Sequence, residues 1–309
     1  MARWLPPADA ARGRPEAVFQ RLAWHRHKRD AGRYRVLEWV VDGARLARVA
    51  LRDVRVPGLY RRWALLGEPD WVGAPGDARA ALADLLDAAR AEGVDVVDCQ
   101  FNMARWPPEA LPPGAEAADF GTYVVDLRGG LDAVVQGLSS GHRRDWRRGL
   151  RDGLETRERV HPAEFIALLR ETYAHGDKAL PFSEAYLRRL LESPAIPTLQ
   201  VGVYADGALQ AAALVPYDAR RGWYLHGGVR RPGPVGAAVL AHVDVMARLI
   251  ERGVPAYDLG GVRPGTTDPR LAGIADFKRR FGGAFEPVAR WRVALSARAR
   301  LVDRVQALR

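Results

Sequence analysis

The hydrophobic and polar positions fall into two successive blocks of similar pattern, each with helices and strands. In the first block, 16–30 predicts a helix with one apolar face, and 76–93 predicts a second helix that starts at a Gly-Asp capping signal. Two segments in which apolar and polar residues alternate flank Asp42-Gly43 and predict two antiparallel strands. This dipeptide is suited to a tight hairpin turn. Further strands are expected at 60–66, 94–102 and 121–127. This half therefore predicts mixed helix and sheet with antiparallel pairing.

The second block repeats this order of elements. Its expected helices cover 162–175, 183–192, 236–252 and 271–281. Its first two strands are joined by Asp206-Gly207. Later strands are expected at 222–229, 256–262 and 288–295. In both blocks a helix precedes a hairpin closed by Asp-Gly, a third strand, and a helix that ends at a glycine.

This repetition predicts a duplicated domain of the α/β (α+β) class. The expected domains are 1–140 and 141–309, each a mixed, mostly antiparallel sheet flanked by helices. A further possibility is that the C-terminal segment packs back on the first domain. Two similar domains side by side create a groove, so the active site is expected in the groove between them or beside them.

Composition narrows the class of protein. The chain has 309 residues, 48% of them apolar, and one cysteine, Cys99, which forms no internal disulfide. The N-terminal segment has no apolar run of the length that a signal peptide requires, so none is expected. The most apolar helix, 236–250, is interrupted by His242 and Asp244, so no membrane span is expected. These features favour a folded cytoplasmic protein that is free to touch the inner surface of a membrane.

The formal charge of +10 comes from a basic excess that is nearly all arginine. Arginine favours an anionic partner, although a coding bias explains the same excess. The segment 141–151 gathers arginines around Trp146, and four of them share one helical face. The five candidate nucleic-acid contacts are Arg143, Arg144, Arg147, Arg148 and Arg151. The alternative is a solvated helix face.

Common catalytic motifs are absent from the sequence. It has no HExxH, no zinc-type Cys/His spacing, no P-loop and no GxSxG, so no metal is expected. The segment 227–243 places glycines and arginines at a helix start, where a phosphate binds readily, and resembles the pyrophosphate loop of GNAT acyltransferases. Val235 stands where that loop has Gly or Ala. An ordinary turn before a helix is the alternative.

The most distinctive stretch is YDLGGV at 257–262, followed by a short loop and FKRRFGG at 277–283. This pair resembles the C-terminal signature of the FemABX family, and weaker similarities extend over nearly the whole chain. The resemblance implies two GNAT-like domains and transfer of an amino acid from aminoacyl-tRNA to an amine of a peptidoglycan precursor. It implies no cofactor, with aminoacyl-tRNA as co-substrate. Without a coiled-coil insertion, the chain resembles the compact members.

The resemblance also implies two catalytic candidates. Lys278 matches the family lysine that stabilises the oxyanion and contacts the tRNA end. Phe277 is then expected to shape the same pocket by stacking on the terminal adenosine, and core packing is its alternative role.

Five further residues are substrate-binding candidates through the resemblance. Lys28, with Arg230 or Arg231, is similar to the residues that bind the phosphates of a UDP-linked muramyl precursor. Tyr257 and Asp258 either line the site or hold the fold. The expected acceptor is a UDP-linked or lipid-linked muramyl peptide, or a small amine.

Two other functions stay open at this point. The first is an N-acyltransferase that uses acyl-coenzyme A, supported by the GNAT-like order of elements. The second is a non-catalytic RNA-binding protein that uses the arginine-rich segment 141–151.

Overall fold

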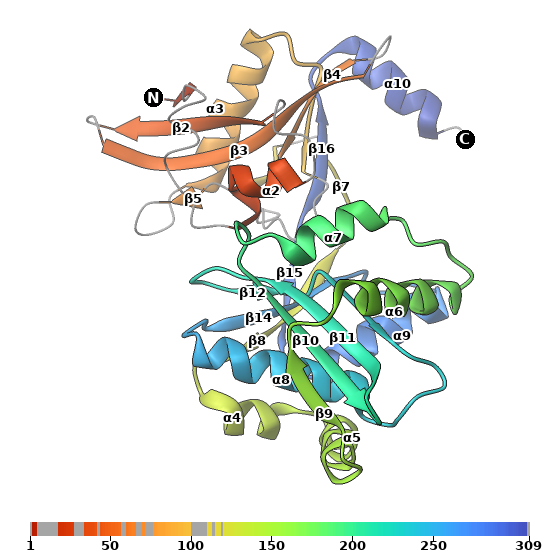
Figure 1. Cartoon of the computed structure of the whole chain (residues 1–309). Coiled ribbons are helices and arrows are strands. Elements are labelled where there is room, and N and C mark those ends of the chain that lie inside the picture. Colours follow the sequence, from red (N-terminus) through yellow and green to blue (C-terminus); the bar gives the residue numbers. More distant parts are fainter. Residues whose placement is uncertain are drawn as a thin grey trace. The chain divides into compact units, whose positions relative to one another are not determined.

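A computed structural model of the chain describes residues 2–4, 18–27, 34–41, 44–56, 60–65, 70–71, 77–99, 110–112, 115–118 and 120–307. It divides into two compact units (Figure 1). Unit 1 comprises Met1–Gly121 and Pro287–Arg309, and unit 2 comprises Thr122–Glu286. The boundary expected between 140 and 141 thus lies inside unit 2, because the strand that begins at Gly121 belongs to a sheet of that unit.

Unit 1 is built on one mixed sheet whose strands run in the order β1-β2-β3-β4-β6-β16-β7, with β5 paired to β3. The strands are β1 (Ala2–Trp4), β2 (Tyr34–Val41), β3 (Ala44–Val56), β4 (Tyr60–Leu65), β5 (Asp70–Trp71), β6 (Val96–Cys99), β7 (Glu116–Ala118) and β16 (Arg290–Ala294). Strands β4 and β6 are parallel, whereas the other pairs that involve β2, β3 and β16 are antiparallel. Because β16 joins this sheet between β6 and β7, the C-terminal segment returns to the first unit.

Helix α3 (Ala78–Ala91) supplies much of the core of unit 1. Asp77 caps its first turn by accepting hydrogen bonds from the backbone of Arg79 and Ala80. Its buried side chains, Leu82 and Leu85 among them, join Trp63 of β4 and other sheet residues in one cluster. The unit also contains η1 (Val18–Gln20), α2 (Leu22–His27) and α10 (Ala297–Ala307). Within the helix expected at 16–30, the described residues form η1 and α2, and α10 has no counterpart among the expected elements.

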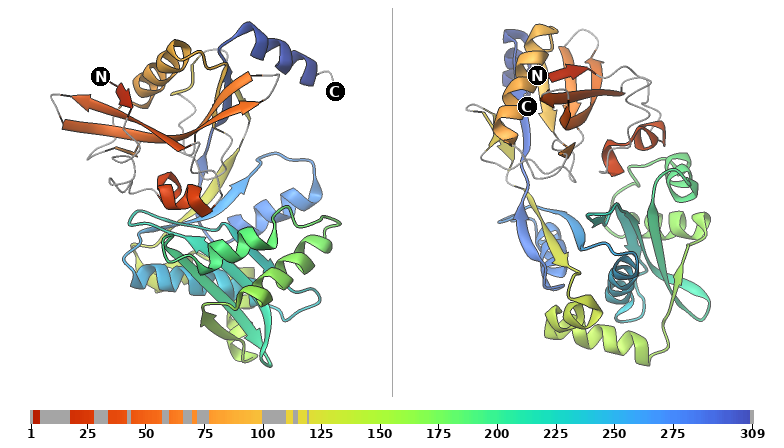
Figure 2. Two further views of the ribbon diagram at one scale, coloured as in Figure 1. Left: turned by 45° about the horizontal axis from the view of Figure 1, so that its top comes forward. Right: turned by 90° about the vertical axis from the view of Figure 1, so that its left-hand side faces the viewer.

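Unit 2 contains two sheets. One has the order β13-β11-β10-β9 and the other β12-β14-β8-β15. The strands are β8 (Gly121–Asp126), β9 (Glu155–Glu158), β10 (Thr198–Ala205), β11 (Ala208–Pro216), β12 (Gly222–Trp223), β13 (His226–Val229), β14 (Ala256–Val262) and β15 (Ala284–Pro287). The helices are α4 (Gly130–Gly137), α5 (Ser140–Arg151), α6 (Pro162–Ala174), α7 (Glu184–Glu192), α8 (Ala237–Glu251) and α9 (Pro269–Arg279). Figure 2 shows α6 and α7 on one face of β10 and β11, with α8 on the opposite face.

The segment 222–229, expected as one strand, is divided between the two sheets of unit 2. Strand β12 pairs in parallel with β14, whereas β13 pairs with β11. The division comes at Tyr224, whose N–H donates to the Asp258 carbonyl of β14, while the next N–H, of Leu225, donates to Leu214 of β11. Beyond this point β13 and β14 belong to different sheets and form no backbone hydrogen-bond pairing with each other.

The hairpin between β10 and β11 shows why the turn prediction holds. Asp206 and Gly207 take positive φ values of 48° and 75°, the conformation that a two-residue hairpin turn requires. The equivalent Asp42-Gly43 lies outside the described residues, but β2 and β3 are antiparallel there, with Val41 opposite Ala44. The α/β (α+β) class with mixed, mostly antiparallel sheets flanked by helices is confirmed.

Two glycines at the ends of α8 test how closely this helix is packed. Both have positive φ, 91° at Gly236 and 70° at Gly253. A methyl group added at Gly236 would collide with the Asp145 carbonyl of α5, whereas one added at Gly253 has nothing within 4 Å. We expect Gly253→Ala to cost roughly 1 kcal/mol from backbone strain alone and Gly236→Ala about 3 kcal/mol or more. Urea denaturation measures both, and equal losses would contradict the close approach of α5.

Candidate active site

The site is built around Lys278 on α9, a lysine that the fold buries. Asp268 begins α9 by accepting hydrogen bonds from the N–H groups of Arg270 and Leu271. The side chain of Lys278 points into unit 2, with the residue 9% exposed, and its Nζ donates to the Gly261 carbonyl at 3.1 Å. The chain has three lysines, at 28, 178 and 278. Lys178 is exposed, whereas Lys278 places its cation in the interior of the unit.

Burial makes the ammonium of Lys278 unusually acidic. Removal from water lowers its pKa from the ordinary 10.5 to about 8, and the negative charge of Asp258 opposes this shift. At neutral pH the side chain is therefore still mostly charged, yet it exchanges its proton far more readily than an exposed lysine does. This combination is typical of lysines that take part in reactions.

Aromatic rings and imidazoles surround this part of α9. His242 of α8 shares a hydrogen bond with the Tyr257 hydroxyl, with 2.9 Å between Nδ1 and the oxygen. Its ring also contacts Tyr224, Phe277 and Phe281. Burial lowers the pKa of His242 to about 3, and the charge of Lys278 adds to the effect. His242 is therefore neutral, and Lys278 is the cation of this cluster.

Asp258 and Tyr257 have partners that hold the fold. Asp258 is 2% exposed and accepts hydrogen bonds from the Thr122 hydroxyl and the Gly260 N–H. Arg221 forms an ion pair with it at 3.6 Å. These contacts join β14 to β8 and to the segment before β12. Tyr257 is fully buried against His242. For both residues the contacts favour the structural alternative, and Asp258 acts on the site through its charge.

The glycines of FKRRFGG are required by close approach of backbone segments. Gly282 has φ of 79°, and a methyl group there would collide with the Gly137 carbonyl at the end of α4. A methyl group at Gly283 would lie 2.8 Å from the Val124 backbone of β8. The two glycines therefore allow the chain after α9 to pass between α4 and β8. This part of the motif fixes the end of the helix that carries Lys278.

The arginine-rich segment forms helix α5, capped by Ser139. Arg144, Arg147, Arg148 and Arg151 are exposed, as their shared helical face predicts. Three of them pair with acidic neighbours: Arg144 with Asp145, and both Arg148 and Arg151 with Asp152. Such exposed pairs are weak and leave the cations available to an anion.

Arg143 differs from the other four arginines of this set. Its guanidinium donates to the carbonyl oxygens of Gln136 and Leu138, at 3.2 and 2.9 Å. It therefore ties α5 to the end of α4 and has a structural role in the fold.

Among the phosphate-binding candidates, Arg230 makes its ion pair with α6 and not with the cluster around Lys278. Arg230 follows β13 and forms an ion pair with Glu171 of α6 at 3.3 Å, and Arg231 is exposed. Lys28 lies outside the described residues.

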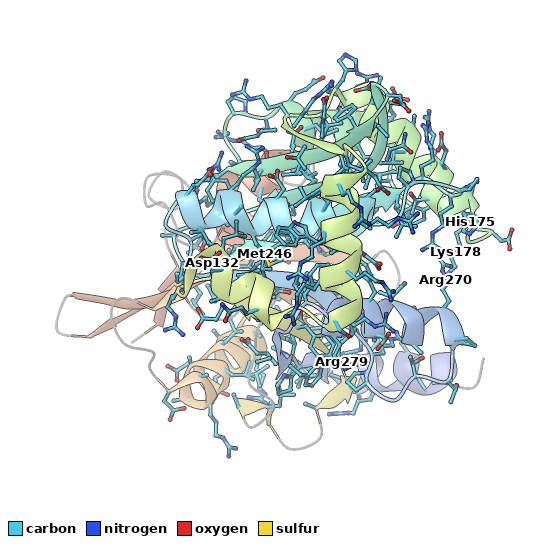
Figure 3. The ribbon with its side chains drawn as sticks, turned by 90° about the horizontal axis from the view of Figure 1, so that it is seen from below. Asp132, His175, Lys178, Met246, Arg270 and Arg279 are labelled. Atoms are coloured by element: carbon cyan, nitrogen blue, oxygen red, sulfur yellow. The ribbon has the colours of Figure 1, made fainter. Side chains whose placement is uncertain are left out.

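The N terminus of α8, expected as an alternative phosphate site, is packed against α5. Gly236 is its N-cap residue and lies against the Asp145 carbonyl and the Gly149 N–H of α5. Figure 3 shows α5 crossing α8 in this region. Val235, 43% exposed, precedes the cap. The contact with α5 restricts the approach of a pyrophosphate to this helix end.

The described residues contain no group of three or more His, Cys, Asp or Glu arranged to hold a metal ion. Among the helices within the same residues, none is long and apolar enough to cross a membrane.

Comparisons with known proteins agree with this architecture. Residues 138–279 match the family model described as an acetyltransferase (GNAT) domain. The crystal structure of FemX is similar at a TM-score of 0.76 and 13% identity, covering 99% of each chain. No curated protein sequence matches the chain significantly.

Two further solved structures share the fold. The C-terminal domain of a putative lysylphosphatidylglycerol synthetase from Agrobacterium fabrum has a TM-score of 0.56 at 18% identity and covers 98% of each chain. The L-PGS structure from Bacillus licheniformis has a TM-score of 0.55 at 15% identity, covering 89% of this chain and 88% of that one. Together with FemX they confirm a FemX-like GNAT fold, as the YDLGGV and FKRRFGG motifs predicted.

We expect Lys278→Met to stabilise the protein at pH 7. Below pH 8 the lysine is charged in both folded and unfolded chains, so the full penalty of burying the charge is present. Its size is about 3 kcal/mol, from which the lost bond to Gly261 subtracts about 1 kcal/mol. The folded state loses its proton first as pH rises from 8 to 10.5, so the advantage of the variant shrinks over that range.

Urea denaturation at pH 7 and pH 10 measures this difference. Lys178→Met is the matched control, since Lys178 is exposed, and its stability should stay within about 0.5 kcal/mol of the parent. A Lys278→Met protein that is less stable than the parent at pH 7 would show that the lysine holds the fold together.

Proposed function

We propose that the protein is an aminoacyltransferase that takes an amino acid from aminoacyl-tRNA and forms an amide with an amine. The observation that carries the proposal is the buried Lys278, whose ammonium donates a hydrogen bond to the Gly261 carbonyl and has a pKa lowered to about 8. The FemX-like fold supports the class of reaction. An amine acceptor and an ester donor need no redox step.

The chemistry follows from the charge of Lys278. The acceptor amine attacks the ester carbonyl, a C–N bond forms, and the carbonyl oxygen becomes an oxyanion. A buried ammonium stabilises that oxyanion strongly because little water screens the interaction. The attacking nitrogen, positively charged after the C–N bond forms, loses a proton to water. The C–O bond to the tRNA ribose then breaks, and the ribose oxygen takes a proton. With its pKa near 8, Lys278 is acidic enough to supply that proton.

The donor is proposed to bind through the exposed face of α5. Arg144, Arg147, Arg148 and Arg151 offer guanidinium groups to successive phosphates of an RNA backbone. Phe277, partly buried against His142, His242 and Phe281, is the proposed aromatic wall of the pocket.

The proposed acceptor is a peptidoglycan precursor or a related small amine on the cytoplasmic side of the membrane. A UDP-linked or lipid-linked muramyl peptide carries phosphates, for which Arg230, Arg231 and Lys28 are the candidate ligands. Arg230 already pairs with an exposed carboxylate, Glu171, which a phosphate would have to displace. The C-terminal domain of the putative lysylphosphatidylglycerol synthetase has the same fold, and that protein is named for a lipid product.

An acyl-coenzyme A-dependent N-acyltransferase is the second candidate. The match of residues 138–279 to an acetyltransferase (GNAT) domain favours it. The packing of α5 against Gly236 and the exposed Val235 argue against a pyrophosphate at the start of α8. A non-catalytic RNA-binding protein is the third candidate. RNA binding alone does not explain why Lys278 is buried.

The test is transfer of radiolabelled amino acids from charged tRNA to UDP-muramyl-pentapeptide, a lipid-linked precursor and free amines. We expect labelled amide from the parent protein, a loss of at least 100-fold in kcat for Lys278→Met, and parent-like activity for the exposed-lysine control Lys178→Met. The same samples should be assayed with acetyl-coenzyme A.

Each alternative has its own signature in this assay. Acyl transfer from coenzyme A, with no transfer from tRNA, would establish the second candidate. Binding of tRNA without any transfer, unaffected by Lys278→Met, would establish the third.

A separate prediction concerns the arginine face of α5. Arg147→Glu should weaken tRNA binding roughly tenfold and lower the slope of log affinity against log salt by about 1, because one phosphate contact is lost. Arg128→Glu is the charge-matched control, since Arg128 is exposed in the same unit but pairs with Asp126. Filter binding between 50 and 200 mM salt measures both. An unchanged salt slope for Arg147→Glu would place the RNA elsewhere.

A further inference from the structure

The end of α9 is held by residues far away in the sequence. The last carbonyl groups of a helix have no partner within it and must be satisfied from outside. At the end of α9 the Lys278 and Arg279 carbonyls accept from Phe281 and Gly282 in a tightened turn, and the Arg280 carbonyl accepts from the Ser139 N–H. The Phe277 carbonyl accepts from a side chain, His142 of α5, at 3.0 Å from Nε2.

His142 is built into this position. It is 3% exposed, and its ring packs edge-on against Phe277 and Phe281, with centroids 5.0 and 4.6 Å away. A carbonyl accepts only from a protonated nitrogen, so Nε2 carries the proton and Nδ1 does not. Among the described residues Nδ1 has no hydrogen-bond partner. Burial lowers the pKa of this histidine, which keeps it neutral at physiological pH.

The acceptor of this bond belongs to the same peptide group as Lys278. The Phe277 carbonyl and the Lys278 N–H lie in one rigid plane. A hydrogen bond that fixes the carbonyl therefore fixes the plane from which the Lys278 side chain departs. The Lys278 side chain starts from a Cα atom of that plane, so the orientation of the plane sets the direction in which the side chain reaches the Gly261 carbonyl.

We propose that His142 is a positioning residue that holds the Lys278 side chain in its buried position against the Gly261 carbonyl, through its hydrogen bond to the Phe277 carbonyl. The catalytic consequence rests on the proposed function, whereas the effect on Lys278 itself does not. Displacement of a catalytic cation by about 1 Å is enough to slow a reaction about 100-fold. His142 touches no reacting atom in this scheme.

Three variants separate positioning from simple stability. His142→Phe keeps a ring in the cavity and removes the donor, and His142→Gln keeps an N–H donor. Ser139→Ala is the matched control, because it removes the side-chain cap of the same helix α5 and leaves the backbone N–H bonded to Arg280. The Tm of each variant is measured first, so that losses of stability are known.

The first readout is the pKa of Lys278, which needs no substrate. Trace acetylation with acetic anhydride across pH 6–11, followed by peptide mass spectrometry, resolves Lys278 from Lys178 and Lys28 because the chain has only these three lysines. We expect the pKa of Lys278 to rise by 1 or more in His142→Phe, to return most of the way in His142→Gln, and to stay unchanged in Ser139→Ala.

The second readout is transfer from aminoacyl-tRNA. We expect kcat to fall at least tenfold in His142→Phe with KM for the acceptor within twofold, and to recover partly in His142→Gln. If His142→Phe lowers Tm as Ser139→Ala does while the pKa of Lys278 stays near that of the parent, the positioning role is wrong. A pKa that rises as expected in a protein with no transfer activity would uphold the positioning role and overturn the proposed function.

Discussion

The burial of one ammonium group is the constraint around which unit 2 is arranged. An isolated cation is costly in an apolar interior, and it persists only where the surrounding structure fixes it and partly compensates it. Here the compensation comes from the Gly261 carbonyl and from the field of Asp258. His242, the nearest titratable ring of α8, is kept neutral and adds no second positive charge. A site that strains the fold in this way is more useful for chemistry than for stability.

Several separate elements converge to support that lysine. Strand β14 contributes Gly261 and Tyr257, helix α8 contributes His242, and α5 contributes His142 through the end of α9. Asp258 in turn is fixed by Thr122 of β8, which comes 136 positions earlier in the chain. The double glycine after α9 then lets the chain leave without disturbing this packing.

The helices and strands were predicted correctly from the sequence where the spacing of apolar residues is regular. Helices α3, α6 and α8 and the β10–β11 hairpin lie close to their expected positions. Apolar spacing indicates the three helices, the Asp77 cap also marks the start of α3, and the Asp-Gly turn marks the hairpin. The division of 222–229 between two sheets was invisible, since it depends on which neighbouring strand each backbone group meets.

The same limit applies to the site. The motif around 277–283 led to Lys278 by resemblance, but its burial depends on contacts made by the whole unit. His242 showed a signal, a polar residue at an apolar helical position, whereas His142 was hidden among arginines. Its partner is 135 positions away, and no pattern in the sequence records that contact. For Asp258, too, a role in the fold is recognised only from its contacts with Thr122, Gly260 and Arg221.

The path of the chain has a consequence for synthesis on the ribosome. Unit 2 is continuous, from Thr122 to Glu286, so all its strands exist once that segment has emerged. Unit 1 begins first but lacks β16, the strand between β6 and β7, until Arg290–Ala294 has been made. The later unit is thus complete while the earlier one still exposes two unpaired strand edges. The sheet that is begun first along the chain is therefore the last to receive all its strands.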